Sequence, residues 1–138
     1  MKREIKFKFW CLGTSENLNF NKKGWWYYPN FLLNKYYSNL DIFNSPDFVA
    51  CQYIGLKDQN GAEIYEGDIV RYEFDGDTYP KEAVNKVLVC KWDQRQAWFI
   101  FDETLEEEWN GYLWREIAKY SKVIGNIYEN PELLNHRL

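Results

Sequence analysis

Four acidic side chains lie close together in the middle of the sequence and are the first candidates for chemistry: Asp58, Glu63, Glu66 and Asp68. Carboxylates that crowd together can hold a magnesium ion or share a proton, as a metal-dependent nuclease or phosphatase requires. Each of these acids also stands beside a turn or at a strand end, where solvated acids are ordinary. A carboxylate enzyme is therefore the least favoured hypothesis, and we predict no catalytic residue, no metal ion and no cofactor.

The run DQNG at residues 58–61 resembles part of a calcium-binding loop, but its register does not fit. With Gly61 at the sixth loop position, the first and twelfth ligands would be Leu56 and Gly67, which carry no carboxylate. The Asn-Gly pair is instead typical of a hairpin turn of type I′, in which both central residues have positive φ. Asp68 follows Gly67 at the start of an expected strand, where its short side chain can accept hydrogen bonds from turn amides.

Other catalytic groups are scarce. His136 is the single histidine and lies near the end of the sequence, so the chain lacks an interior histidine as general base or metal ligand. No Walker loop, GxGxxG or GxSxG motif is present. Cys11, Cys51 and Cys90 are odd in number and widely spaced, which favours neither a disulfide framework nor a zinc site. A reducing cytoplasm is the simplest compartment for such cysteines.

Basic residues near the N-terminus give the hypothesis of single-stranded nucleic-acid binding a better physical case than catalysis. The candidate contacts are Lys6, Lys8, Lys22 and Lys23. Small barrels can stack bases on strand aromatics and follow the backbone with lysine and arginine. Residues 1–36 have a net charge of +5 and residues 37–138 a net charge of −9. The total of −4 argues against a broadly basic binding surface, so nucleic-acid binding remains the alternative hypothesis.

The leading hypothesis is a non-enzymatic module that self-associates and docks another protein. Aromatic residues make up 20% of the chain, which is more than one small core needs, and exposed aromatic patches often mark interfaces. The candidate interface residues are Trp25, Trp26, Tyr27 and Tyr28. A purely structural role for them, covering one end of the core, stays open.

The spacing of apolar residues predicts a chain built mainly from short strands. Alternation over residues 3–10 places Ile5, Phe7 and Phe9 on one face, as in a half-buried strand. Further strands are expected at residues 48–54, 69–74, 84–92, 97–101 and 122–128, the last with a bulge at Gly125. Short helices are expected within residues 109–117 and from Asn130, which precedes a proline.

These elements predict a mainly β protein, a small barrel of SH3-like type. Its 138 residues suit one domain over residues 1–138, with an irregular aromatic excursion at 11–49 and a short C-terminal helix or tail at 129–138. No apolar run reaches the roughly 18 residues of a membrane span. The N-terminus has charges among its apolar positions and no apolar signal core. We therefore expect a protein of the cytoplasm with no membrane contact.

Three blocks of the sequence together resemble YopX-type proteins. The central block is Gln52–Val70, the opening block is Arg3–Phe7 and the closing block is Val123–Leu134. The resemblance is weaker at Lys86–Phe101 and is lost through most of residues 12–49. It implies a β-barrel fold, a bacteriophage or prophage origin, a homo-oligomer and no assigned activity. The resemblance carries over no catalytic residue. We separately expect a host or phage protein as a partner.

Overall fold

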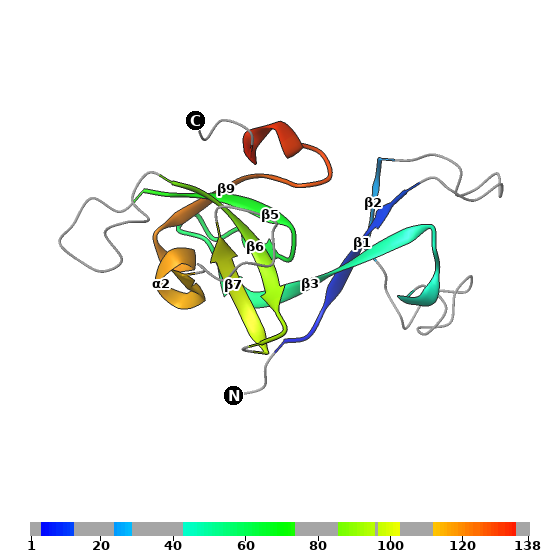
Figure 1. Cartoon of the computed structure of the whole chain (residues 1–138), viewed down its shortest axis with the longest axis horizontal. Helices are drawn as coiled ribbons and strands as arrows, with labels where there is room; N and C mark the ends of the chain where they lie inside the picture. The colour runs from blue at the N-terminus through cyan, green and yellow to red at the C-terminus, as the bar shows by residue number, and fades with distance from the viewer. Residues whose placement is uncertain are drawn as a thin grey trace. The chain divides into compact units, whose positions relative to one another are not determined.

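The structure is a computed structural model that describes residues 4–12, 24–28, 43–73, 86–95, 97–102 and 112–134. Within these ranges the chain is mainly β, as the sequence predicts (Figure 1). The strands are β1 (Phe7–Cys11), β2 (Trp26–Tyr27), β3 (Phe48–Lys57), β4 (Glu63–Tyr65), β5 (Asp68–Tyr72), β6 (Val87–Asp93), β7 (Trp98–Asp102), β8 (Tyr112–Leu113) and β9 (Ser121–Asn126). The helical pieces are α2 (Trp114–Lys119) and the 3-10 helix η2 (Pro131–Leu134).

The strands form two antiparallel sheets, in the orders β2-β1-β3-β4 and β8-β7-β6-β5-β9. This arrangement is consistent with a small β-barrel fold. The chain divides into two compact units, which we call the first unit (Glu4–Gln52) and the second unit (Tyr53–Leu138). Strand β3 runs through both, because its first half pairs with β1 and its second half with β4. The expectation of one domain over residues 1–138 stays a prediction.

The core of the second unit is built from alternate residues of five strands and from one face of α2. Its buried members are Ile54, Ile64, Val70, Tyr72, Leu88, Cys90, Phe99, Phe101, Ile117 and Ala118. Removing each large apolar side chain from water contributes about 1.5–3 kcal/mol, so this cluster supplies the main driving force for folding the second unit. In Figure 1, β5, β6 and β7 lie side by side in this unit.

A hairpin joins β3 and β4 where the sequence predicts one, but its turn is of another type. The Gly61 N–H donates to the Asp58 carbonyl oxygen at 3.0 Å, and the Asp58 N–H donates to the Ala62 carbonyl oxygen at 2.8 Å. Gly61 has φ +85°, whereas Asn60 is not among the residues with positive φ. This is a type I turn followed by a left-handed glycine, the usual three-residue hairpin loop. Only one of the two residues that type I′ requires adopts positive φ.

The bulge predicted at Gly125 is present in β9. Gly125 lies opposite Ile69, but Val123 lies opposite Val70, so Ile124 is an extra residue in the pairing of β9 with β5. A side chain at Gly125 would meet the Asn130 side-chain oxygen at 2.5 Å. The glycine therefore gives the segment after β9 room to turn back toward the sheet before η2.

A largely buried ion pair lies on the other face of the β6–β7 hairpin. Lys91 Nζ and Asp102 Oδ2 are 3.0 Å apart, and their side chains are 19% and 4% exposed. Each pairs across the hairpin with an apolar residue, Ile100 and Val89 respectively. Because two opposite charges are buried together, each offsets the desolvation of the other.

Several details differ from the sequence prediction. Strand β1 begins at Phe7, and Ile5, which we placed on its buried face, is 66% exposed. The segment 11–49 is not irregular throughout, because it contains the end of β1, strand β2 and the start of β3. The helix predicted within residues 109–117 occurs later, at α2. No helix among the described residues is long and apolar enough to cross a membrane.

Candidate functional site

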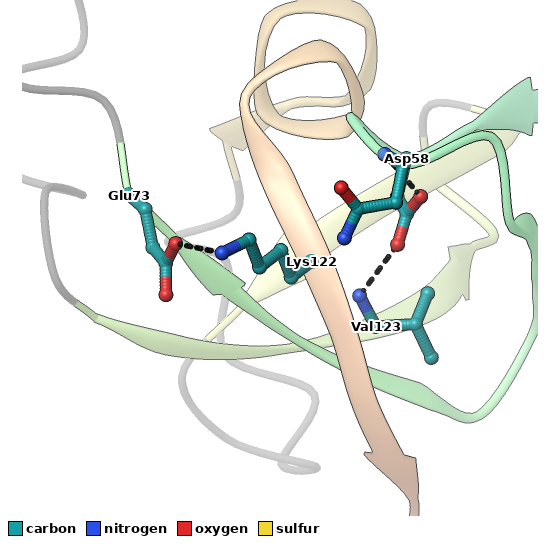
Figure 2. Close-up of polar contacts among 5 residues, drawn as sticks. Asp58, Glu73, Lys122 and Val123 are labelled. Carbon is teal, nitrogen blue, oxygen red and sulfur yellow. Dashed lines mark hydrogen bonds and ion pairs between the residues drawn. The ribbon is translucent and has the colours of Figure 1, made fainter.

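The carboxylate of Asp58 connects the β3–β4 turn to a strand that is distant in the sequence. Its Oδ1 accepts hydrogen bonds from the backbone N–H groups of Asn60 (2.8 Å) and Ala62 (2.9 Å). Its Oδ2 accepts one from the Val123 N–H of β9 at 2.9 Å (Figure 2). The side chain is thus an acceptor for three backbone donors, and Asp58 is 7% exposed. The Gln59 N–H also donates to the Ser121 carbonyl oxygen at 2.9 Å, so the turn covers the outer edge of β9.

Asp68 stabilises a turn, as the sequence predicts. Its Oδ2 accepts a hydrogen bond from the Tyr65 N–H at 2.8 Å, within the turn that joins β4 to β5. Gly67 precedes it with φ +87°, and a side chain there would come within 2.9 Å of the Tyr128 ring. The Gly67 N–H donates to the Cys90 carbonyl oxygen, and its own carbonyl accepts from the Ile127 N–H. Gly67 is therefore enclosed by two other segments of the second unit.

The four acids of the central block do not gather into a single site. Asp58 and Asp68 are buried and bind backbone amides of their own turns, whereas Glu63 and Glu66 are half-buried. Among the described residues, no three or more His, Cys, Asp or Glu side chains are placed so that they could hold a metal ion. The acidic run Glu106–Glu108 and His136 lie outside the described residues.

All three cysteines are free thiols and buried. The pKa of Cys90 is raised well above its usual value, first by complete burial and then by the negative charges of Asp68 and Glu66. A buried thiol that stays protonated is a poor nucleophile. Cys90 is therefore a core residue of β6, and its position does not support a catalytic role.

The raised pKa of Cys90 predicts a specific loss of stability in alkali. The Cys90 thiol of the unfolded chain ionises at about pH 8.5, whereas the folded thiol stays protonated there. The contribution of the protonated thiol to the free energy of unfolding is therefore fully present below that pH. This contribution is lost as the pH rises toward the higher pKa of the folded state, by at most about 1.4 kcal/mol per pH unit. Urea unfolding of Cys90→Ala at pH 7 to 10 should show a shallower decline than the wild-type chain. Leu88→Ala, which also removes buried volume from β6, should keep the wild-type slope, and equal slopes for both variants would contradict the assignment.

In the first unit, six aromatic rings form a continuous set of contacts that we call the aromatic cluster. Its members are Phe7, Phe9, Trp25, Tyr27, Phe43 and Phe48. Phe43 meets Phe7 edge to face at a centroid distance of 4.8 Å and Phe9 at 5.1 Å. Phe9 and Phe48 are buried, but Phe43 is 40% exposed. The cluster therefore continues from the core of this unit to its surface.

The four predicted interface residues divide between two groups of contacts. Trp25 and Tyr27 pack in the aromatic cluster, both in contact with Phe48. Trp26 instead contacts Trp10 of β1 at a centroid distance of 5.0 Å. Tyr28, just after β2, is 64% exposed. This division follows from the alternation of side chains along a strand.

The lysines of the nucleic-acid hypothesis are placed less favourably for binding phosphates. Lys8 is 9% exposed and its ammonium lies 4.0 Å from the centroid of the Trp26 ring. Lys6 forms an ion pair with Glu4 at 3.2 Å. Lys22 and Lys23 lie outside the described residues. Of the four candidate lysines, the structure describes two: Lys8 is buried against an aromatic ring, and the charge of Lys6 is partly neutralised by Glu4.

The fold defines a small, mainly β protein of the barrel class. A family model described as YopX protein matches residues 14–135, and the chain belongs to that family. The opening block of the resemblance, Arg3–Phe7, lies before the matched range. The crystal structure of protein EF1440 from Enterococcus faecalis is similar, with a TM-score of 0.55, 23% identity and coverage of 96% of this chain and 99% of that one. That likeness concerns the fold alone. No curated protein matches the sequence.

Proposed function

We propose that this YopX-family chain is a non-enzymatic binding module that associates with a second copy of itself through the aromatic cluster of the first unit. The main support is the exposure of Phe43 at the border of a cluster that is otherwise buried or half-buried. Ile5, two residues before β1, is 66% exposed and enlarges the apolar surface of this unit. Covering such apolar surface with a partner removes it from water, which is favourable in free energy.

Charge supports a second copy as the partner. Glu4 and Lys6 flank Ile5 and pair with each other at 3.2 Å, with 64% and 34% of their side chains exposed. In a twofold symmetric dimer the same surface meets itself, so adjacent opposite charges can exchange partners across the axis. A host or phage protein would be a further partner of this module. The cytoplasm of a bacterial host is the compartment we propose, since three free thiols suit a reducing environment.

Light scattering after size-exclusion chromatography tests self-association directly. The wild-type chain should have the mass of an oligomer at about 100 μM, and the double variant Ile5→Ser/Phe43→Ser should dissociate at least about tenfold more readily. Trp98→Ser is the matched control, because Trp98 is also 40% exposed but lies on β7 of the second unit. A wild-type monomer at that concentration, or a double variant with unchanged mass, would contradict the proposal.

The alternative of single-stranded nucleic-acid binding through the first unit makes a different prediction. Binding would be strongly salt-dependent and would weaken when Lys6, Lys22 and Lys23 are neutralised. The engagement of Lys8 with Trp26 and of Lys6 with Glu4 makes this the weaker candidate.

A further inference from the structure

Two positive side chains lie directly opposite each other in the second unit. Arg71 of β5 pairs in register with Lys122 of β9. Directly opposite positions on antiparallel strands have Cβ atoms about 4.5–5.5 Å apart, and like charges there repel. Arg71 is exposed and the Lys122 side chain is 42% exposed. Residues 53–138 have a net charge of −7, so this pair is a local concentration of positive charge in an acidic part of the chain.

One acid neutralises only part of this charge. Glu73, just after β5, approaches Lys122 with Oε2 at 3.1 Å from Nζ, as Figure 2 shows. Among the described residues, the Arg71 guanidinium has no ion pair and no hydrogen bond. A guanidinium offers five N–H donors in a planar fork that matches the oxygens of a phosphate or carboxylate. Arg71, Lys122 and Glu73 together therefore carry one positive charge, and the N–H donors of the Arg71 guanidinium are unused among the described residues.

The backbone beneath these side chains is fixed on both sides. Strand β5 pairs with β6 on one edge and β9 on the other. The Val123 N–H donates to the Asp58 carboxylate, and the Gln59 N–H donates to the Ser121 carbonyl oxygen. The backbone of β9 is therefore hydrogen-bonded to the β3–β4 turn immediately before and after Lys122. A site on such paired strands loses little conformational freedom when a ligand binds.

The bulge in β9 is the reason these two charges meet. If Ile124 paired regularly with Val70 instead of bulging, the register set by Ile69 and Gly125 would place Val123, not Lys122, opposite Arg71. The irregularity thus replaces a neutral neighbour of Arg71 with a cation. In the absence of a ligand, placing a second positive charge opposite Arg71 is unfavourable because the two charges repel each other.

We propose that Arg71 and Lys122 form a binding site for a phosphate group, carried either by a free phosphate compound or by the backbone of a single-stranded nucleic acid. Arg71 would bind two phosphate oxygens through its fork, and Lys122 would contribute a point charge. Glu73 competes with the phosphate for Lys122 and thereby weakens binding. This site goes beyond the proposed self-association, because it lies in the second unit and does not use the aromatic cluster.

Titration of the full-length chain at low salt tests the site with two probes, inorganic pyrophosphate and an oligodeoxythymidylate. Arg71→Gln should weaken binding at least about tenfold, and Glu73→Gln should strengthen it about threefold. The control Arg95→Gln removes an exposed charge from the β6–β7 turn and should leave binding unchanged. With the oligonucleotide, the slope of log K against log salt should fall by about 0.7 when one phosphate contact is lost.

The two probes distinguish the sources of phosphate. Binding of pyrophosphate alone identifies a small phosphate compound as the ligand, and binding of the oligonucleotide alone identifies a nucleic-acid backbone; either result supports the site. Thermal unfolding should show Arg71→Gln to be at least as stable as the wild-type chain, because repulsion with Lys122 is relieved. No binding of either probe, or equal losses of binding for Arg71→Gln and Arg95→Gln, would overturn the proposal.

Discussion

Replacing Asp58 by alanine should lower the free energy of unfolding by about 3 kcal/mol. The change removes the acceptor for three backbone N–H groups, and the Val123 donor lies on a half-buried strand that is remote in the sequence. A hydrogen bond to a charged group contributes about 1.5–3 kcal/mol, although contributions within one cluster are not additive. Urea unfolding followed by tryptophan fluorescence measures the loss.

Two further variants make this test specific. Asp58→Asn keeps one acceptor oxygen and should lose less stability than Asp58→Ala, because only part of the network is broken. Glu63→Ala removes another acid of the same hairpin, a half-buried one, and should change stability by less than about 1 kcal/mol. Hydrogen exchange at the Val123 amide should accelerate in Asp58→Ala. Unchanged exchange there would mean that the bond to β9 has no energetic importance.

Replacing Gly67 by alanine should also cost about 3 kcal/mol. A non-glycine residue in the left-handed region costs roughly 1–2 kcal/mol, and Gly67 has φ +87°. The added Cβ would also lie 2.9 Å from the Tyr128 ring and 3.5 Å from Ile127, and overpacking of this kind costs about 1–3 kcal/mol. Thermal and urea unfolding measure the sum.

Gly61 provides the matched control for this prediction. It has φ +85°, but a Cβ there would meet nothing within 4 Å, so Gly61→Ala should cost only the backbone strain of roughly 1–2 kcal/mol. Combining Gly67→Ala with Tyr128→Ala should recover part of the steric loss, relative to the sum of the two single changes. Equal costs at Gly61 and Gly67 would show that the contact with Tyr128 contributes nothing.

Both predictions concern the central and closing blocks of the YopX resemblance, which the structure brings together. Asp58 binds the backbone of Val123, Asp68 pairs in register with Asn126, and Gly67 lies against Tyr128. The two blocks are therefore one structural motif of the second unit. Of the four acids that first suggest a metal site in the central block, Asp58 and Asp68 accept hydrogen bonds from backbone amides of its turns.

The part of this protein predicted well from sequence is local. The hairpin at Gly61, the turn role of Asp68 and the bulge at Gly125 were predicted because glycine and short acids act on their own neighbours. The mainly β class followed from short apolar alternations between such turns, and the family followed from the blocks themselves.

The candidate sites were predicted less well, because they depend on which residues face one another. The exposed position of Phe43 was not predicted. The separation of Trp25 and Tyr27 from Trp26 could have been predicted, because side chains alternate along a strand such as β2. The burial of Lys8 against Trp26 requires the pairing of β1 with β2, which composition does not reveal.

The sequence by itself determined the turns, the β-rich class and the family of this protein, because each depends on residues that are close along the chain. Only the tertiary structure decided the partner of Asp58 on β9 and the opposition of Arg71 and Lys122. Both depend on the register between strands that are distant in the sequence. A single extra residue, Ile124, shifts that register by one position. Gly125 predicts that a bulge occurs in β9, but the periodicity of either strand alone does not give the pairing that results.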